Sequence, residues 1–311
     1  MKIMFMGTPE ISALCLKKLI EDGKDVCSVI SREDKPRGRG NVMTPTPTKA
    51  LAAESGIPVY TPKTLRGGEF SEILAKHEPD LIAVVAYGKI LPAEVINYPK
   101  YGCINVHVSL LPKYRGAAPM QRAVMEGESE TGVTIMYMDE GLDTGDIITA
   151  ESFPLTEEDD FETVHDRSAE IGAKLLSEVI DKLALGEASR TKQDDSLATY
   201  AKKVEKEDCK VDFSLDAKTV SARVRGVTPI PGAFCYLNGK MLKISKVKAT
   251  EGKGKPGEVI ELDPSGEGFI KIACSTGALT VKAVVPEGKG KMSAGDFIRG
   301  RKIQIGDILT K

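Results

Sequence analysis

The sequence lacks long apolar segments. Of its 311 residues, 41% are hydrophobic and 28% are charged, and no apolar run approaches the roughly 20 residues that an α-helix needs to span a bilayer. Residues 1–7 are a short apolar run with one charge and no small-residue cleavage site, which is typical of a buried first strand and not of a secretory signal. We therefore expect a cytoplasmic protein with no membrane role.

Clusters of metal-binding side chains are also missing. A structural zinc site needs four cysteine or histidine ligands close together. The three histidines are dispersed along the chain, and the six cysteines are widely scattered without a CxxC pair: Cys15, Cys27, Cys103, Cys209, Cys235 and Cys274. We therefore expect buried free thiols and no metal.

Two common nucleotide-binding signatures are absent. The first apolar run ends in Gly7-Thr8-Pro9 and not in GxGxxG, and the P-loop sequence GxxxxGK followed by Ser or Thr occurs nowhere. Both signatures hold phosphates through the backbone amides of a glycine-rich loop. A bound dinucleotide and a P-loop nucleotide are therefore disfavoured.

Charge is distributed unevenly along the chain. The net charge is only -2, but residues 208–311 hold 18 Lys and Arg against 11 Asp and Glu, a net +7, which leaves -9 for residues 1–207. Such asymmetry is one sign of a polyanion-binding module beside a catalytic one. Ordinary solvated lysines would give the same count, so charge alone leaves both interpretations open.

Short apolar runs alternate with amphipathic segments through the first part of the chain. Strands are expected at residues 2–6, 26–31, 80–87, 103–108, 131–139 and 147–153. Helices are expected at residues 48–55, 69–77, 117–125 and 163–185. Strands rich in Val and Ile that alternate with helices indicate an α/β fold, a doubly wound, mostly parallel, Rossmann-like sheet covered on both faces.

The pattern changes near residue 186. The polar segment that follows has no clear period, and we expect residues 190–207 to be a linker between a catalytic domain at 1–189 and a basic domain at 208–311. In that second domain, short apolar runs recur between glycine and proline residues, at 232–237, 241–247, 257–261, 268–274 and 279–285. Several short strands with turn signals predict a small β-barrel of the oligonucleotide-binding (OB) type.

Polar residues near the end of an expected strand are the first candidates for chemistry. Side chains two apart on a strand point to the same side, so Asn105 and His107 share one face. An amide donor beside an imidazole suits acyl transfer, because the amide can hold the oxyanion of a tetrahedral intermediate while histidine moves a proton. Two hydrogen-bonded strand-end residues without a catalytic role would show the same pattern.

A carboxylate could complete this pair. Residues 138–146 follow an apolar strand and contain Asp139, Glu140, Asp143 and Asp146. A carboxylate that reached His107 would fix its tautomer and favour the imidazolium, whereas loop carboxylates commonly cap turns beside glycines. Spacing alone does not say which of the four would do so.

Residues 105–119, with the sequence NVHVSLLPKYRGAAP, resemble the signature of the folate-dependent formyltransferase family, and in particular of its members that act on methionyl-tRNA. Residues 6–10, 84–92 and 130–136 are also similar to that family, so the resemblance covers most of the first 190 residues. The chain departs from it at Val108, where a smaller residue is usual, and at Ile11, where phenylalanine is common. The first could crowd the site and the second could alter a substrate pocket, but neither removes a chemical group.

The resemblance implies an activity and a set of residues. The activity is transfer of the formyl group of 10-formyltetrahydrofolate to the α-amino group of methionine on initiator tRNA, which leaves tetrahydrofolate and supplies translation initiation. By resemblance the catalytic trio is Asn105, His107 and Asp143. Folate contacts are expected from Ser109, Leu110, Leu111 and Pro112. We expect a monomer that uses no metal.

A long polar loop, residues 32–40, interrupts the α/β pattern after the second expected strand. Long loops are often functional, and arginines flanked by glycines can approach phosphates closely. In the resembling family this loop grips the acceptor stem of tRNA, which makes Arg37 and Arg39 the tRNA-binding candidates. A solvated connection is the alternative.

Two rival functions remain open. The first is a formyltransferase of the same fold that acts on a nucleotide sugar or on glycinamide ribonucleotide. The second is a tRNA-binding or folate-binding protein without catalysis. The Arg39 loop and the basic C-terminal part argue against the first, and the intact set of Asn105, His107 and Asp143 argues against the second.

Overall fold

The structure is a computed structural model that describes residues 1–37 and 42–311, and it contains two compact units. The first unit comprises Met1–Gly116, Gly132–Phe153 and His165–Tyr200. The second comprises Ala117–Thr131, Pro154–Val164 and Ala201–Lys311. Neither unit is continuous along the chain, because two short segments between strands and helices of the first unit pack with the second.

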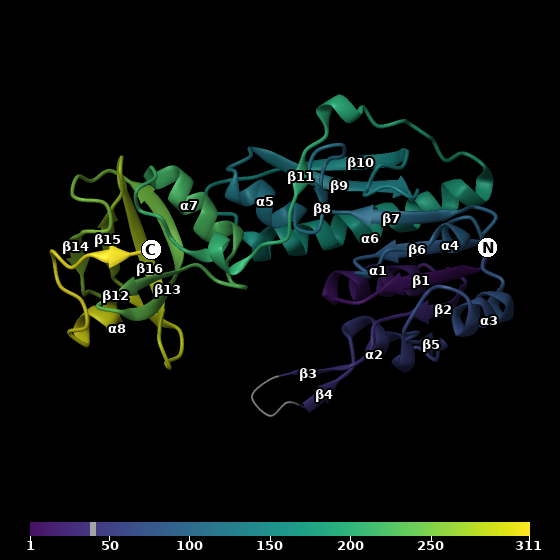
Figure 1. Ribbon diagram of the computed structural model, residues 1–311, viewed down its shortest axis with the longest axis horizontal. Helices are drawn as coiled ribbons and strands as arrows, with labels where there is room; N and C mark the ends of the chain where they lie inside the picture. The colour runs from purple at the N-terminus through teal and green to yellow at the C-terminus, as the bar shows by residue number, and fades with distance from the viewer. Residues whose placement is uncertain (38–41) are drawn as a thin grey trace. The chain divides into compact units, whose positions relative to one another are not determined.

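The first unit is built on a seven-stranded sheet (Figure 1). Its strands are β1 (Ile3–Gly7), β2 (Val26–Ile30), β5 (Val59–Tyr60), β6 (Leu81–Val85), β7 (Cys103–His107), β9 (Glu130–Tyr137) and β10 (Ile147–Pro154). Their order is β10-β9-β7-β6-β1-β2-β5. The five strands from β5 to β7 run parallel, and β9 is antiparallel to β7. The predicted mostly parallel sheet is confirmed.

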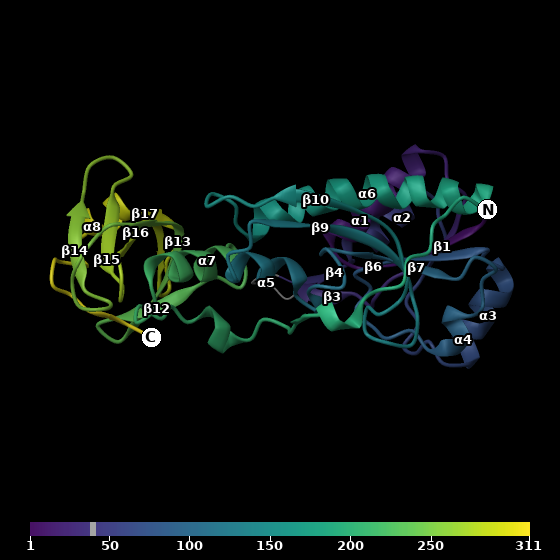
Figure 2. The same cartoon turned by 90° about the horizontal axis from the view of Figure 1, so that it is seen from above.

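Helices cover both faces of this sheet (Figure 2). One face is covered by α1 (Glu10–Glu21), α2 (Pro47–Glu54) and α6 (Phe161–Leu185), and the other by α3 (Gly68–His77) and α4 (Ala93–Ile96). Successive side chains of a strand point to opposite faces. Accordingly Ile3 and Phe5 belong to the core under α1 and α6, whereas Met4 and Met6 belong to the core under α3 and α4.

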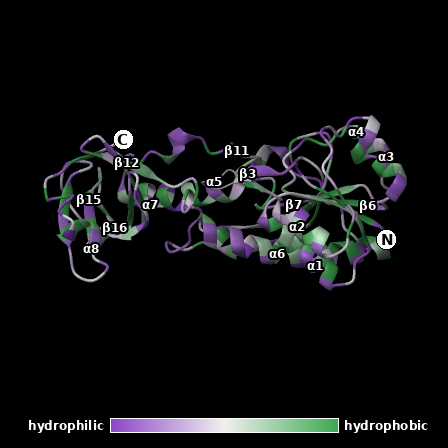
Figure 3. Cartoon of the chain, turned by 90° about the horizontal axis from the view of Figure 1, so that it is seen from below, coloured by the Kyte–Doolittle hydropathy of each residue, from purple (hydrophilic) through white to green (hydrophobic). Residues whose placement is uncertain are grey.

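Local sequence explains where these helices begin and which side they bury. Thr46 precedes α2, and its hydroxyl accepts a hydrogen bond from the Lys49 amide at 3.2 Å, with Pro47 in the first turn. Apolar positions of α6 recur at helical spacing, and its hydrophobic and hydrophilic residues alternate in bands along the ribbon (Figure 3). Helix α1, which was not among the expected helices, buries Ile11, Leu16 and Leu19 in the same way.

The segment expected as a long polar loop, residues 32–40, contains one short strand and is followed by a second. β3 (Lys35–Arg37) and β4 (Val42–Thr44) form an antiparallel pair, with Lys35 opposite Thr44. The expectation of an unstructured loop is therefore wrong for these flanking residues, because their backbone groups bond to each other. Arg39 lies outside the described residues, and so does the side chain of Arg37.

The second unit contains an antiparallel sheet in the order β14-β15-β16-β13-β12-β18, with β17 paired to β16. The strands are β12 (Phe234–Leu237), β13 (Lys240–Thr250), β14 (Val259–Asp263), β15 (Phe269–Ala273), β16 (Ala278–Pro286), β17 (Met292–Ser293) and β18 (Leu309–Thr310). The Val259 amide donates to the Asp307 carbonyl, and the Leu309 amide to the Gly257 carbonyl, each at 2.8 Å. These bonds join the β14 edge to the chain leading into β18, so the sheet curls into the predicted small barrel.

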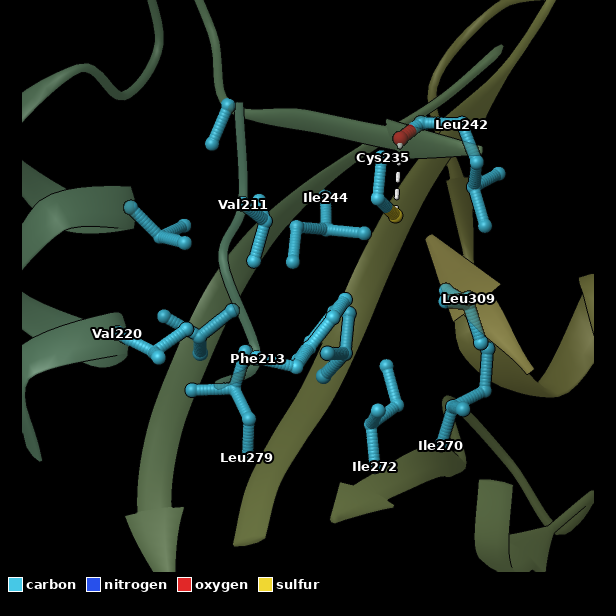
Figure 4. Packing of buried hydrophobic residues seen from close by; sticks show 14 of the residues in the cluster. Val211, Phe213, Val220, Cys235, Leu242, Ile244, Ile270, Ile272, Leu279 and Leu309 are labelled. Carbon is cyan, nitrogen blue, oxygen red and sulfur yellow. Dashed lines mark hydrogen bonds between the residues drawn. The ribbon is translucent and has the colours of Figure 1, made fainter. Parts of the chain in front are cut away.

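The barrel encloses an apolar core to which strands, a preceding loop and the chain end all contribute. Figure 4 shows Phe213 packed among Ile244, Ile272 and Leu279. Cys235 lies in the same core, where its thiol contacts the Leu242 carbonyl at 3.5 Å and burial raises its pKa to about 12. All six cysteines are free, as expected.

Two further helices, α7 (Ala217–Gly226) and α8 (Ala294–Arg299), pack against the barrel strands and were not expected from the sequence. Helix α7 also packs against α5 (Pro119–Met125) within the second unit. The remaining elements are a short pair, β8 (Arg115–Gly116) with β11 (Tyr200–Ala201), and the 3-10 helices Asp195–Leu197 and Lys206–Cys209. No helix in the described part of the chain is long and apolar enough to cross a membrane.

The contact between α5 and α7 generates a stability prediction. A Cβ at Gly226 would lie 2.7 Å from the Gln121 carbonyl oxygen and 2.9 Å from the Met125 amide nitrogen, both parts of a helix backbone that cannot rotate away. We expect Gly226→Ala to lower the free energy of unfolding of the second unit by about 1–3 kcal/mol, which outweighs the gain in helix propensity of up to about 1 kcal/mol. Urea unfolding followed by hydrogen-exchange mass spectrometry measures this change.

Gly290→Ala is the matched control, because a Cβ there meets no atom within 4 Å. It should change the unfolding free energy by less than about 0.5 kcal/mol. Equal stability of the two variants would show that α5 and α7 are not in close contact.

Candidate active site

Polar side chains gather where the strand order of the first unit reverses. The chain runs outward from β1 to β2 and β5, then returns to β6 on the other side of β1. Ligands of open α/β sheets bind beyond the carboxyl ends of strands near such a point. Here the Ser12 hydroxyl donates to the Val85 carbonyl at 2.5 Å, and the Thr8 hydroxyl donates to the Tyr87 carbonyl at 3.2 Å. These bonds join the first turn of α1 to the end of β6, and the loop after β1 to the loop after β6.

Asn105 and His107 occupy the last part of β7, the strand next to β6. The register places Asn105 opposite Val84 of β6 and Met136 of β9. Both side chains lie on the same face of the sheet, as expected from their spacing. Asn105 is half-buried, and its side chain makes no hydrogen bond to any residue that the structure describes. Its amide is therefore available to a bound molecule.

His107 is almost completely buried, with 5% of its surface exposed, and both of its ring nitrogens face a partner. Nε2 lies 3.0 Å from the carbonyl oxygen of Tyr114. Because a carbonyl can only accept, Nε2 carries a proton and donates it. Nδ1 faces the Asp143 carboxylate, with 3.7 Å between Nδ1 and Oδ2. Nδ1 is thus the nitrogen left to exchange a proton near the carboxylate.

Asp143 differs from the other three carboxylates of its loop. It is the one with an ion-pair distance to His107, and its Oδ2 also accepts a hydrogen bond from the Gly116 amide at 2.8 Å. Asp139 caps the turn by accepting from the Gly141 amide and the Thr144 hydroxyl. Asp146 pairs with Arg190 at 3.1 Å, and Glu140 is exposed. The structure thus identifies Asp143 as the carboxylate of this loop that faces His107, which the spacing of the sequence could not decide.

The four residues expected to contact folate form a turn directly after β7. The Ser109 hydroxyl donates to the Lys113 carbonyl at 2.7 Å, and the Thr134 hydroxyl of β9 donates to the Ser109 carbonyl, also at 2.7 Å. Ser109 and Leu111 are buried, whereas Leu110 and Pro112 are partly exposed. This turn is held beside His107, and its accessible surface comes from Leu110 and Pro112.

The two departures from the family pattern lie away from these polar groups. Ile11 is buried, and Val108 is partly buried, in the core beneath α1 and α6. That core lies on the face of the sheet opposite to Asn105 and His107, since Val106 on the same strand also belongs to it. Val108 thus fills apolar space in that core, on the face of the sheet opposite to the polar groups.

Three polar contacts in this region come from residues that sequence reasoning missed as site components. Gln193 and Arg115 are buried and hydrogen-bonded to each other, and Gln193 also donates to the backbone of the Asp143 loop. The Tyr114 carbonyl orients His107. Arg115 stood in the quoted motif, but Gln193 lies in the segment interpreted as a linker, where a polar sequence without a period carried no signal of burial.

Other reactive side chains nearby are not suited to covalent catalysis. Burial raises the pKa of Cys103, at the start of β7, to about 12, so its thiol stays protonated and poorly nucleophilic at neutral pH. Burial likewise raises the pKa of Tyr87 to about 12, and its hydroxyl has no hydrogen-bond partner among the described residues. Within residues 1–37 and 42–311, no three His, Cys, Asp or Glu side chains are arranged to hold a metal ion.

A pocket of about 630 Å³ lies in the second unit, between α5 and α7. Two of its cations pair with neighbouring carboxylates: Arg122 with Asp208 at 2.7 Å, and Lys210 with Glu207 at 2.8 Å. It contains no imidazole or side-chain amide. The group around His107, where an imidazole, an amide and a carboxylate come together, is the stronger candidate for chemistry.

Comparison with known proteins gives similarity over the whole chain. Residues 1–180 match the formyl transferase family model, and residues 203–302 match that of the formyl transferase C-terminal domain. The methionyl-tRNA formyltransferase of Citrifermentans bemidjiense is 47% identical over 311 residues, which covers 100% of this chain and 97% of the relative.

Two solved structures share the fold. One is HypX from Aquifex aeolicus in complex with tetrahydrofolic acid, at a TM-score of 0.67 and 22% identity, covering 97% of this chain. The chain spans about half the length of that protein, 47%. The other is WlaRD, a sugar 3N-formyl transferase, at a TM-score of 0.66 and 18% identity, covering 93% of this chain and 99% of WlaRD. At these identities the likeness shows the fold alone.

Proposed function

This chain belongs to the formyl transferase family, and from that premise we propose that it transfers the formyl group of 10-formyltetrahydrofolate to the α-amino group of methionyl-tRNA. The observation that carries the proposal is the arrangement of an unbonded amide, Asn105, on the same strand face as His107, whose Nδ1 faces the Asp143 carboxylate. Similarity to the methionyl-tRNA enzyme over the full chain supports the choice of acceptor.

The reaction forms one carbon–nitrogen bond and breaks another. The α-amino nitrogen attacks the formyl carbon and gives a tetrahedral intermediate with a negative oxygen. Its collapse breaks the bond to N10 of the folate. The amine loses a proton, N10 gains one, and the products are N-formylmethionyl-tRNA and tetrahydrofolate. A free α-amine has a pKa of about 7.7–8.0, so only a modest environmental effect is needed to make the acceptor neutral near physiological pH.

Asn105 and His107 act on the charge that develops. We assign Asn105 to the oxyanion, because its side-chain amide is a donor without another partner among the described residues. His107 donates through Nε2 to Tyr114, so proton exchange and charge stabilisation in the site fall to Nδ1. Asp143 stabilises positive charge on the imidazole and orients the ring. No covalent enzyme intermediate is required.

The formyl donor is assigned to the turn at Ser109, Leu110, Leu111 and Pro112. Support comes from its position directly after His107 and from its attachment to Thr134 of β9, which keeps it rigid. Leu110 and Pro112 offer apolar surface for the planar part of the folate, because they are the partly exposed members of the turn.

The tRNA is assigned to basic residues, with initiator tRNA as the acceptor. Residues 208–311 carry a net +7, and a basic module suits phosphate contacts. Arg37 and Arg39 are proposed to contact the acceptor stem on the strength of the family resemblance of their loop. In this assignment residues 1–189 carry the trio that performs the chemistry, and residues 208–311 bind tRNA. Residues 190–207 lead from one to the other, and their first part, up to Tyr200, packs with the first unit.

We also propose that the chain acts as a monomer in the cytoplasm. Asn105, His107 and Asp143 all come from one unit of one chain, so the site needs no residue from a second copy. Six free cysteines suit a reducing compartment, and that is where aminoacyl-tRNA is used for translation.

The sugar-modifying alternative is supported by the shared fold alone. WlaRD covers most of this chain at 18% identity, whereas the methionyl-tRNA relative is 47% identical over all of it. Function resides in the site and not in the fold, so the higher, full-length identity outweighs the structural likeness.

The first functional prediction concerns the trio. Replacing Asn105 with alanine removes an oxyanion donor, which typically costs roughly 100-fold to 1,000-fold in rate, and we expect His107→Ala and Asp143→Ala to abolish most turnover too. Single-turnover formylation of methionyl-initiator tRNA measures these rates. Because each change removes a polar group and little core packing, circular dichroism should remain that of the wild type.

Glu140→Ala is the control, since Glu140 is an exposed carboxylate of the same loop. It should keep the wild-type rate within about twofold, as surface substitutions usually do. A folded His107→Ala variant with near-normal rates would exclude His107 from catalysis.

The second prediction concerns the tRNA loop. Phosphate contacts release counterions, so affinity for tRNA should fall steeply with salt, while affinity for the folate should change far less. We expect Arg39→Ala to raise KM for methionyl-tRNA and to reduce the salt slope by roughly one contact. Titration of each ligand at several salt concentrations measures both effects. Arg66→Ala, an exposed arginine outside the loop, serves as control, and identical slopes for the two variants would remove Arg39 from the tRNA interface.

A further inference from the structure

The loop that carries Asp143 holds it in an unfavourable backbone conformation. Asp143 has φ of +53°, in the left-handed region, which is unfavourable for residues other than glycine, although Asp and Asn adopt it more readily than most. Such a conformation persists only when surrounding contacts over-determine it. The loop therefore needs partners beyond its own residues.

Part of the loop is fixed from within. Asp139 accepts hydrogen bonds from the Gly141 amide at 3.0 Å and from the Thr144 hydroxyl at 2.7 Å. The Tyr137 amide donates to the Asp146 carbonyl at 2.9 Å. Gly145 approaches β9 so closely that a Cβ would overlap the Tyr137 carbonyl oxygen. These contacts hold the ends of the loop but leave the carbonyl groups of Asp143 and Gly145 without a partner inside it.

Gln193 supplies that partner from a distant part of the chain. Its side-chain Nε2 donates to the Asp143 carbonyl at 2.9 Å and to the Gly145 carbonyl at 2.7 Å. Gln193 is only 7% exposed. The side-chain amide of Gln193 thus uses both of its protons to hold the carbonyl groups of Asp143 and Gly145.

Arg115 fixes the orientation of this amide. Its Nε and Nη2 donate to Gln193 Oε1 at 3.1 and 2.8 Å. Since a guanidinium can only donate, the oxygen of the Gln193 amide must face Arg115 and the nitrogen must face the loop. Arg115 is 2% exposed, and its Nη2 also donates to Asp195, whose side chain is 76% exposed.

The same short segment of chain touches every member of this arrangement. The Tyr114 carbonyl accepts from His107, the Arg115 side chain donates to Gln193, and the Gly116 amide donates to the Asp143 carboxylate at 2.8 Å. These hydrogen bonds therefore form one network, which connects His107 to Asp143 through residues 114–116 and Gln193. All of these residues belong to the first unit.

The segment that carries Gln193 is itself fastened. The Thr191 amide donates to the Ile147 carbonyl and the Ile147 amide to the Thr191 carbonyl, at 2.9 and 2.8 Å. The guanidinium of Arg190 lies 4.0 Å from the centre of the Tyr137 ring. Farther along, the Tyr114 amide donates to the Thr199 hydroxyl at 2.9 Å. The backbone around Gln193 is thus held by these contacts, so Gln193 does not lie in a flexible linker.

We propose that Gln193 is a positioning residue for the reaction, which holds the Asp143 loop so that the carboxylate faces Nδ1 of His107, and that Arg115 fixes the amide of Gln193 for this task. The proposal rests on the proposed function, because it assigns Gln193 an effect on formyl transfer that is exerted through Asp143. If Gln193 only provided hydrogen bonds to two buried carbonyls, it would stabilise the fold, and its effect on the rate of formyl transfer would not depend on Asp143.

The test uses Gln193→Glu in the full chain. Glutamate keeps an oxygen toward Arg115 but replaces the donating nitrogen with a second oxygen that faces two carbonyls. We expect kcat for methionyl-tRNA to fall by roughly 10-fold to 100-fold, the size of effect that a displacement of about 1 Å can cause, with KM for both substrates unchanged. Asp195→Asn is the matched control, since it removes the negative charge of the exposed partner of Arg115, keeps an oxygen that can accept from Arg115 and leaves Gln193 in place, and it should stay within about twofold of wild type.

A double-mutant cycle separates positioning from support of the fold. In an Asp143→Ala background the carboxylate is already gone, so Gln193→Glu should lower kcat by less than about twofold further. An equal fold-loss in both backgrounds, or no loss in the wild-type background, would overturn the proposal. Should Gln193→Glu fail to fold, Gln193→Met, which lacks both the donor and the repulsive oxygen, replaces it in the same cycle.

Hydrogen-exchange mass spectrometry provides a readout that does not depend on activity. Peptides covering residues 139–146 should exchange faster in Gln193→Glu than in wild type and in Asp195→Asn. Unchanged exchange would contradict the proposal whatever the kinetics. If wild type itself fails to formylate methionyl-tRNA, the proposed function fails, and the exchange measurement still decides whether Gln193 holds the loop.

Discussion

The hydrogen bond from His107 Nε2 to the Tyr114 carbonyl oxygen determines how the imidazole can be used. It assigns the donor role to one ring nitrogen and turns the other toward Asp143. The carboxylate is held in turn by the Gly116 amide, two residues beyond Tyr114. A single stretch of backbone thereby sets the spacing between imidazole and carboxylate, and the remaining contacts of the first unit keep that stretch in place. Asn105, free of partners among the described residues, adds a donor on the same strand face.

The parallel sheet makes this arrangement possible. Side chains of β7 alternate between two cores, so Val106 packs beneath α1 and α6 while Asn105 and His107 face the other way. The antiparallel neighbour β9 brings Thr134 opposite His107 and leads directly into the Asp143 loop. Because β7 and β9 are neighbours in the sheet, residues 105–107 and 139–146, which are distant in the sequence, lie side by side in one site. The second unit has a separate core of its own, to which Phe213 and Leu279 belong.

Much of this could be predicted from the sequence, because alternation and helix period are local signals. The strands around Ile3, Val29 and Ile104 and the spacing of Asn105 and His107 are of that kind, and so is the Thr46-Pro47 start of α2. The choice of Asp143 over Asp139 or Asp146 needed the resemblance, since spacing does not encode which loop carboxylate turns inward. The role of Gln193 was not predictable, because its burial depends on tertiary contacts with Arg115 and with the Asp143 loop. The polar sequence around it is typical of a linker. The β3–β4 pair was missed for a similar reason, as charged residues such as Lys35 and Arg37 carry little strand signal.

The most direct test of the account is a competition between acceptors. Wild-type protein is given 10-formyltetrahydrofolate carrying a labelled formyl group, together with methionyl-initiator tRNA and a nucleotide-linked amino sugar in the same reaction. The label is then followed into each product by chromatography and mass spectrometry. The account predicts that it appears as N-formylmethionyl-tRNA, with the amino sugar unmodified. Label that accumulates in the amino sugar, or that remains in the folate while tRNA stays unmodified, would contradict it.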